Sequence, residues 1–228
     1  MLSLKKTKIL AVGAGLALSL AACGGSDSDT TGSTGGSGAE TSSSPTPAAA
    51  IDTLTGKQTA VTLDPAFLEG LTALKLMPAT IGGATLEGAK IAFPITGGNV
   101  TYFDPASGVT PFVQGLINHD DSGLRLTGAN GKVVELTDFV VDPAESMLTG
   151  KGTVDGMVFA ESAPLFFLDG STLNPLEVKA DQGVAILEGT TVSLTKEAAE
   201  ALNGVFGTDA LTEFFPVGVA EITVALPS

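Results

Sequence analysis

Short runs of alternating apolar and polar residues dominate the chain from residue 51 to residue 228. Ile91, Phe93 and Ile95 are separated by single residues, and Leu124 and Leu126 alternate with polar neighbours. A period of two places successive side chains on opposite faces, as in antiparallel sheets with one buried face. The pattern predicts strands over 58–63, 90–95, 99–103, 112–118, 123–127, 132–141, 147–154, 156–161, 164–168, 184–194 and 217–226.

Turn and cap signals add a hairpin and two short helices to this pattern. Asn130-Gly131 stands between two apolar-alternating runs, which is a strong hairpin signal. Asp64 is a good N-cap and Pro65 suits a first helical position, so a helix is predicted to residue 71. A second helix is predicted over 195–203, where a threonine caps the start and a glycine follows the end.

The helical segments also belong to a short internal repeat. Residues 59–64 align with 190–195 at an offset of 131, and 82–86 resembles 218–222. Each copy would be strand, capped helix, loop and strand, although a match this short also fits chance similarity. The predicted fold is mainly β: an antiparallel sandwich or flattened barrel of about ten strands, with two short helices covering its ends and a possible internal duplication.

The first 22 residues have the features of an export signal. Lys5, Lys6 and Lys8 precede an uncharged apolar run over 9–20. A positive start, a short apolar core and small residues at its end are typical of such signals. The run is too short to cross about 30 Å of hydrocarbon as a helix, which disfavours a transmembrane anchor.

The residues that follow this run, Leu20-Ala21-Ala22-Cys23, resemble the lipobox read by lipoprotein signal peptidase. The resemblance implies cleavage before Cys23, a diacylglycerol on its sulfur, and a lipid-anchored protein at the extracytoplasmic face of the cell membrane. Two or three acyl chains anchor a protein firmly, whereas one chain binds marginally. An ordinary secretory signal with an incidental cysteine is the alternative. No other cysteine is present, so the chain forms no intramolecular disulfide.

Residues 24–50 are rich in Gly, Ser, Thr, Ala and Pro and contain no Leu, Ile, Val, Phe or Met. Such a composition cannot bury a core and predicts a disordered tether. The expected organisation is therefore a signal peptide over 1–22, the lipidated cysteine with its tether over 23–50, and one β-rich domain over 51–228. About 178 residues is long enough for one domain with its own core.

The domain is strongly acidic. Residues 51–228 hold 8 basic and 22 acidic residues, a formal charge of −14. Phosphate binding needs clustered Lys and Arg, so the composition excludes a nucleic-acid partner. The chain has no Trp and one Tyr, which disfavours a carbohydrate platform built on aromatic faces.

No catalytic or metal-binding motif emerges from the residue pattern. His119 is the only histidine, and the residues around it predict a solvated turn between two strands. No G-x-S-x-G stretch marks a nucleophilic serine, and one histidine with no usable cysteine cannot form a His/Cys zinc site. Calcium stays a minor alternative because Asp120, Asp121, Asp138 and Asp142 offer oxygen ligands without EF-hand spacing. We expect no enzyme and no resident cofactor or metal.

Two resemblances extend this picture. Residues 58–226 resemble secreted and lipid-anchored domains without assigned activity that are common in actinobacteria. The shared phrases are Phe93-Pro94-Ile95-Thr96-Gly97-Gly98, Phe139-Val140-Val141-Asp142-Pro143 and Leu202-Asn203-x-x-Phe206-Gly207. This resemblance implies an exported, compact β-rich domain and no particular reaction.

The second resemblance concerns the stretch from Gln114 to Leu124, which is similar to a strand–turn–strand segment of HtaA-type haem-uptake domains. Those domains are β-rich and surface-attached, and they bind haem through a Tyr with a His nearby. The resemblance implies that Tyr102 and His119 would take these roles. This chain departs from the pattern, because Asn118 replaces a Gly and the turn is one residue longer.

The sequence thus favours a membrane-anchored, surface-exposed lipoprotein with a non-catalytic structural or partner-binding role. The alternative is a lipoprotein of an uptake system that binds haem or another small ligand. The membrane is the expected partner through the lipid on Cys23, and the protein or small-molecule partner is left open.

Overall fold

Thirteen strands and two α-helices build the domain in this computed structural model, which describes residues 45–227. The predicted export signal, the lipobox with Cys23 and most of the tether lie outside the described residues. The strands are β1 (Ala49–Ile51), β2 (Lys57–Leu63), β3 (Met77–Gly82), β4 (Thr85–Glu87), β5 (Lys90–Pro94), β6 (Gly97–Tyr102), β7 (Val113–Thr127), β8 (Val133–Asp142), β9 (Met147–Val154), β10 (Met157–Asp169), β11 (Glu177–Lys179), β12 (Val184–Leu194) and β13 (Pro216–Ala225). The helices are α1 (Pro65–Ala73) and α2 (Lys196–Phe206), with short 3-10 turns at Pro105–Ser107, Gly170–Thr172 and Ala180–Gln182.

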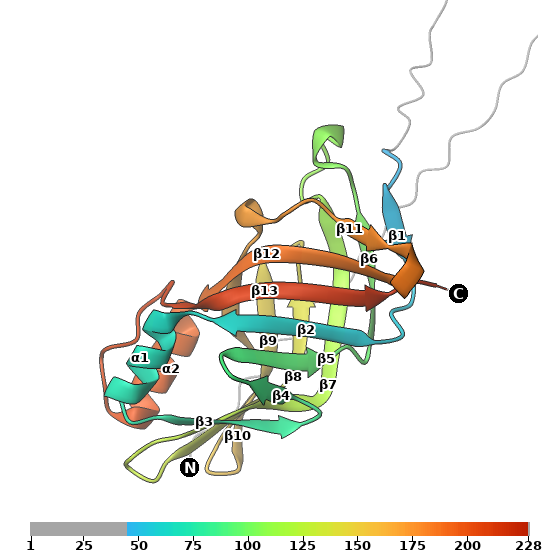
Figure 1. Ribbon diagram of the computed structural model, residues 1–228. Coiled ribbons are helices and arrows are strands. Elements are labelled where there is room, and N and C mark those ends of the chain that lie inside the picture. The colour runs from blue at the N-terminus through green and yellow to red at the C-terminus, as the bar shows by residue number, and fades with distance from the viewer. Residues whose placement is uncertain (1–44, 228) are drawn as a thin grey trace, which may run out of the picture. The chain divides into compact units, whose positions relative to one another are not determined.

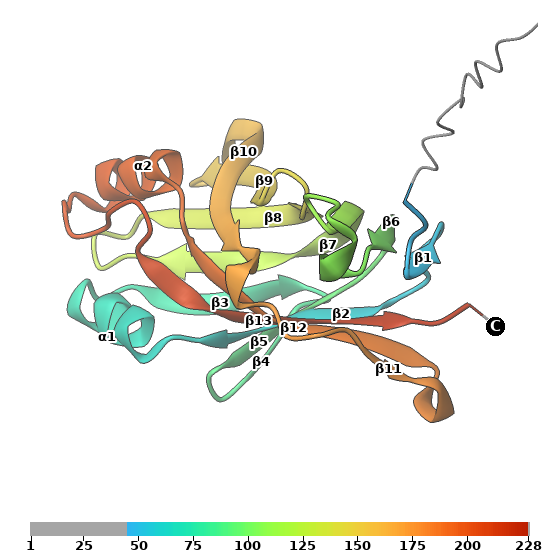
Figure 2. The ribbon, with the colours of Figure 1, turned by 90° about the horizontal axis from the view of Figure 1, so that it is seen from above.

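All the strand pairs are antiparallel and belong to one curled sheet. The hydrogen-bonded order is β1-β6-β7-β8-β9-β10-β12-β13-β2-β5-β4, with β11 added to β12 and β3 added to β7. The sheet folds over at β10, which pairs with β9 over most of its length and with β12 only through Phe166–Asp169. Figure 2 shows the resulting half-barrel, with β7, β8 and β9 in one layer and β2, β5, β12 and β13 in the other. This confirms the predicted mainly β architecture.

One long strand, β7, replaces the two strands and the turn predicted around His119. Val113, Ile117 and His119, all at odd-numbered positions, are buried on one face of the strand. From Ser122 onward the buried side chains stand at even-numbered positions. Residues 120–122 form a bulge opposite Asp138, and the Asp121 N–H donates to the Asp138 carboxylate at 3.0 Å. The expected turn was wrong because these local hydrogen bonds let the strand pass through a bulge without ending.

Both helices begin at the predicted caps. The Asp64 carboxylate accepts from the Ala66 N–H at 2.7 Å, and the Thr195 hydroxyl accepts from the Ala198 N–H at 3.1 Å. Phe67 and Leu71 of α1 are buried. Figure 1 places the two helices together at one end of the sheet, whereas the prediction set them at both ends. The opposite end, near β1 and β11, has no α-helix.

The predicted internal repeat holds for its first half. β2 leads into α1 and β12 leads into α2, and both strands run antiparallel to β13, which lies between them. The paths then differ, because β13 returns beside β12 while β3 pairs with β7. Residues 82–86 and 218–222 are therefore not equivalent in the fold.

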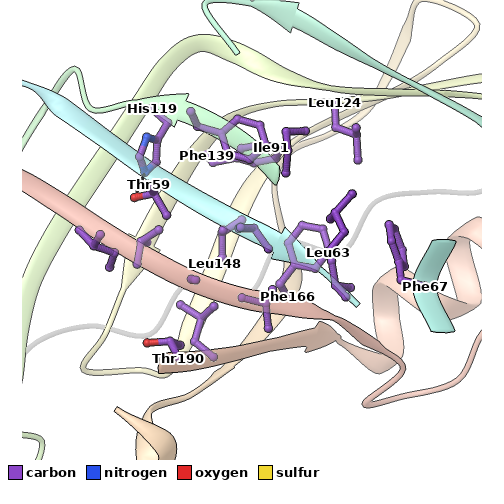
Figure 3. Close-up of a pocket in the computed structure, with 18 of the residues that line it drawn as sticks. Thr59, Leu63, Phe67, Ile91, His119, Leu124, Phe139, Leu148, Phe166 and Thr190 are labelled. Atoms are coloured by element: carbon purple, nitrogen blue, oxygen red, sulfur yellow. Dashed lines mark hydrogen bonds between the residues drawn. The ribbon is translucent and has the colours of Figure 1, made fainter. Parts of the chain in front are cut away.

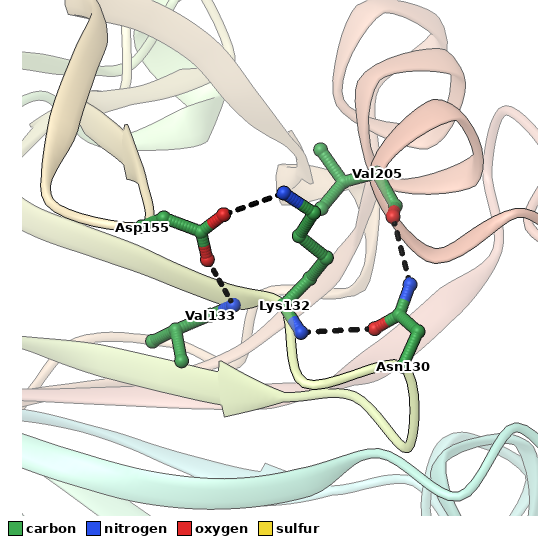
Figure 4. Close-up of polar contacts among 5 residues, drawn as sticks. All are labelled: Asn130, Lys132, Val133, Asp155 and Val205. Atoms are coloured by element: carbon green, nitrogen blue, oxygen red, sulfur yellow. Dashed lines mark hydrogen bonds and ion pairs between the residues drawn. The ribbon is translucent and has the colours of Figure 1, made fainter.

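Polar contacts tie the end of α2 to the tip of the β7–β8 hairpin, and that tip to the turn between β9 and β10 (Figure 4). The Asn130 side-chain amide donates to the Val205 carbonyl at 3.1 Å. Asp155 accepts from the Lys132 ammonium at 2.7 Å and from the Val133 N–H at 3.0 Å. These hydrogen bonds, the one from Lys132 above all, hold the pKa of Asp155 below its usual value. The predicted Asn130-Gly131 hairpin is confirmed and also anchors the helix.

The described part of the chain carries its own hydrophobic core. The buried apolar side chains run from Ile51 to Val224 and come from both layers of the sheet and both helices. β1 pairs with β6 from Ala49 onward, so the sheet includes Ala49 and Ala50, which the composition assigned to the tether. Within residues 45–227, no helix is both long and apolar enough to cross a bilayer.

Candidate functional site

An apolar cavity of about 300 Å³ lies between the two layers of the sheet. Side chains from both layers and from α1 line it, and Figure 3 shows Phe67, Leu148, Phe166 and Ile91 turned toward the same space. None of its lining residues is Asp, Glu, Lys, Arg or Tyr. Small-molecule sites are concave, mostly apolar and of roughly 300 Å³ or more, so this cavity lies at the small end of that range.

Two groups of lining residues are exposed enough to mark openings. Pro78, Ala79, Leu86 and Gly88, on β3, β4 and the turn after β4, are exposed at the surface. β3 pairs with β7, and β4 pairs with β5. No ladder of hydrogen bonds therefore closes the gap between β3 and β4. Ser146 and Thr190 are half-buried and belong to the turn before β9 and to β12. At these two places the lining of the cavity reaches the surface of the domain.

The polar feature of the interior is the pair formed by His119 and Thr59. His119 is 1% exposed and Thr59 is 5% exposed. The two imidazole nitrogens lie 2.8 Å from the Pro94 carbonyl (Nδ1) and 3.1 Å from the Thr59 hydroxyl (Nε2). Because a carbonyl only accepts, Nδ1 carries the proton of the neutral ring, and the Thr59 hydroxyl donates to Nε2. His119 is therefore a buried strand residue, and the prediction of a solvated turn histidine was wrong.

Burial lowers the pKa of His119 below its usual 6.5, an effect that the Pro94 and Phe93 carbonyls and Asp120 only partly oppose. The unfolded chain therefore binds more protons than the folded domain below about pH 6.5. We expect the free energy of unfolding to be fully retained above this pH and to fall as the pH drops below it, by at most about 1.4 kcal/mol per pH unit for one proton.

Urea unfolding between pH 7.5 and 5.5, above the range where most carboxylates titrate, measures this dependence. His119 is the only histidine in the chain. A slope that survives unchanged in a His119→Phe variant would contradict the assignment to this ring.

Tyr102 lies elsewhere, in a second cavity of about 200 Å³ among β1, β6, β11 and β13. Its ring is half-buried and packs edge-on against Phe112 at a centroid distance of 6.0 Å. The two cavities share a wall formed by Val113, Leu187 and Ile222, but Tyr102 lines only the smaller one and His119 only the larger. The structure therefore does not join the two residues in one site.

Haem does not fit the residues present. No Tyr lines the larger cavity to bind iron, and both nitrogens of His119 already have partners, the Thr59 hydroxyl at Nε2 and the Pro94 carbonyl at Nδ1. Haem also carries two carboxylates, and the larger cavity offers no cation to pair with them. The partner of His119 in the larger cavity is Thr59, and Tyr102 does not line this cavity.

Three of the four aspartates considered for calcium use their carboxylates in local hydrogen bonds. Asp138 accepts from the Asp121 N–H, Asp120 accepts from the Thr96 hydroxyl, and Asp142 accepts from the backbone N–H groups of the turn that follows it. Among the described residues, no three His, Asp or Glu side chains are grouped so that they could hold a metal ion.

The fold and the cavity define a class: a curled antiparallel β domain with an apolar interior space between its layers. Among solved structures it is similar to the C-terminal domain of HtaA from Corynebacterium glutamicum, with 15% identity, a TM-score of 0.55, and coverage of 77% of this chain and 99% of that domain. The N-terminal domain of the same protein gives 16% identity, a TM-score of 0.46, and coverage of 76% and 99%.

No protein-family model and no curated protein matches the chain. At 15% identity the likeness shows a shared fold, which confirms the fold implied by the resemblance to HtaA-type domains.

Sequence reasoning missed the cavity and the role of Thr59. One signal was present, because His119 continues the period-two series of Val113 and Ile117 and so belongs on the buried face. Nothing in the local sequence links Thr59 to a residue sixty positions later.

Proposed function

We propose that this protein is a lipid-anchored lipoprotein of the cell envelope whose β domain holds a small apolar molecule without transforming it. The observation that carries the proposal is the cavity of about 300 Å³ between the layers, which no charged side chain lines. Well-packed interiors hold few voids larger than a water molecule, so an apolar space of this size favours a ligand over a packing defect.

The similarity in fold to HtaA domains supports a ligand-holding role more than a purely structural one. The lipobox with Cys23 and the tether would place such a domain at the outer face of the membrane, within reach of apolar molecules that water does not carry. A surface module that only binds a protein partner would not need an interior cavity.

A catalytic role has weaker support. The Thr59 hydroxyl donates to His119 as a nucleophile would to a base, but the other ring nitrogen faces a carbonyl and no carboxylate. No Lys, Arg, Asn or Gln lines the cavity to stabilise an oxyanion. The backbone of Thr59 is held in ladders with β5 and β13 on both sides.

Titration of purified residues 24–228 with Nile red, a neutral apolar dye, tests the proposal. We expect a saturable rise and blue shift of its emission with one dye per chain. Haemin is titrated in parallel with the wild type and with Tyr102→Ala and His119→Ala variants. Dye emission that rises without saturation would contradict a cavity site. A saturable Soret band that is lost in Tyr102→Ala would move haem capture ahead of this proposal.

A further inference from the structure

We propose that the cavity selects an uncharged molecule that is mainly hydrocarbon, of the long-chain alcohol class, and rejects ligands that carry a carboxylate. This inference rests on the proposed function and names the chemistry of its ligand. Three features of the described residues carry it: the lining, the hydrogen-bonding capacity of the buried pair, and the charge at one opening.

The lining offers nothing that compensates a buried charge. Its only polar side chains are His119 and the hydroxyls of Thr59, Thr80, Ser146 and Thr190. Transfer of an ionised carboxylate into such a space without a cation is strongly unfavourable, whereas a hydrocarbon chain gains by leaving water.

The buried pair can accept a hydrogen bond but has none left to donate. The His119 Nδ1–H is directed to Pro94, and the Thr59 O–H is directed to His119 Nε2. The Thr59 oxygen keeps a lone pair, which matches a ligand hydroxyl. A carboxylate only accepts, so at the Thr59–His119 pair it would meet lone pairs and no proton. Burial lowers the pKa of His119, so the ring stays neutral and supplies no cation at neutral pH.

The segments that surround Ser146 and Thr190 are acidic, and none of their carboxylates lines the cavity itself. Three short segments contribute lining residues there, 141–146, 168–173 and 187–192. They contain Asp142, Glu145, Asp169 and Glu188 and no Lys or Arg. A carboxylate head resting there would lie in a negatively charged part of the surface, which disfavours its binding. An uncharged alcohol head would not be disfavoured in this way.

Displacement of bound Nile red from residues 24–228 by 1-dodecanol and by dodecanoate tests the inference at pH 7.5, with the alcohol kept below its solubility limit and dodecanoate below its micelle-forming concentration. The two chains are equal in length and differ only in the head group. We expect the alcohol to displace the dye at a concentration at least tenfold lower. Equal displacement, or stronger displacement by dodecanoate, would overturn the inference while leaving the proposed function intact. Absence of saturable dye binding would mean that the proposed function itself fails.

A variant that introduces a positive charge at this opening tests the same inference independently. Thr190→Lys places an ammonium at the acidic opening, and Thr62→Lys places the same charge on an exposed position of β2. We expect Thr190→Lys to improve dodecanoate displacement several-fold with 1-dodecanol little changed, and Thr62→Lys to change neither. An equal gain in both variants would attribute the preference to overall charge, and would overturn the selection argued from the cavity.

Discussion

A Leu148→Trp variant is expected to lose at least nine-tenths of its affinity for Nile red while keeping the fold. Leu148 is half-buried on β9, and Figure 3 shows its side chain in the cavity opposite β2. An indole in this place would fill much of the space that a ligand needs. Because the cavity can take part of the added volume, we expect a stability loss of about 1–3 kcal/mol or less.

The matched control is Leu116→Trp, the same substitution at an outward position of β7 that is 44% exposed and lines neither cavity described above. We expect its affinity for the dye to equal that of the wild type. The chain has no native tryptophan, so the emission of each introduced indole also reports its surroundings. Full dye binding in Leu148→Trp, with circular dichroism unchanged, would show that the dye binds elsewhere.

Replacing His119 with phenylalanine is expected to lower the free energy of unfolding by about 2–4 kcal/mol. The substitution preserves an aromatic ring beside Phe93, which packs 6.4 Å from the imidazole. It leaves the Pro94 carbonyl and the Thr59 hydroxyl without their partner, and an unpaired buried polar group costs about 1–3 kcal/mol. Urea denaturation at pH 7.5 measures the change.

A double-mutant cycle separates this effect from packing. Thr59→Val removes the hydroxyl that His119→Phe leaves unpaired, so the double variant should be more stable than the two single losses predict. We expect a coupling of about 1 kcal/mol between the two positions. Additive losses would mean that the Thr59–His119 hydrogen bond contributes nothing to the fold.

Period-two alternation predicted the sheet well where one face is buried. Strands β2, β9 and β12 lie within one residue of the predicted ranges 58–63, 147–154 and 184–194. The strands that were missed are short or mostly exposed, such as β3, β4 and β11, and so carry no alternating apolar signal. Residues 156–161 and 164–168 are joined in β10, because register shifts against β9 replace the expected break.

The candidate site could not be predicted from short stretches of the sequence, for a different reason. His119, Leu148, Phe166 and Thr190 come from four strands that meet only when the sheet folds over at β10. The cavity depends on how far the two layers stay apart, which no short stretch of sequence encodes. Tyr102 was singled out because it is the only tyrosine that could take the role implied by the resemblance, and the structure places it at the smaller cavity.

The most direct test of the central claim is where the ligand binds. Methyl resonances of Leu, Ile and Val in residues 24–228 can be followed by NMR during a titration with 1-dodecanol. The account predicts saturable shifts at Leu63, Ile91 and Leu148, which line the larger cavity, and none at the exposed Leu116 and Val178. Shifts confined to Val178 and its neighbours around Tyr102, or to exposed side chains, would contradict it and leave the larger cavity without a ligand.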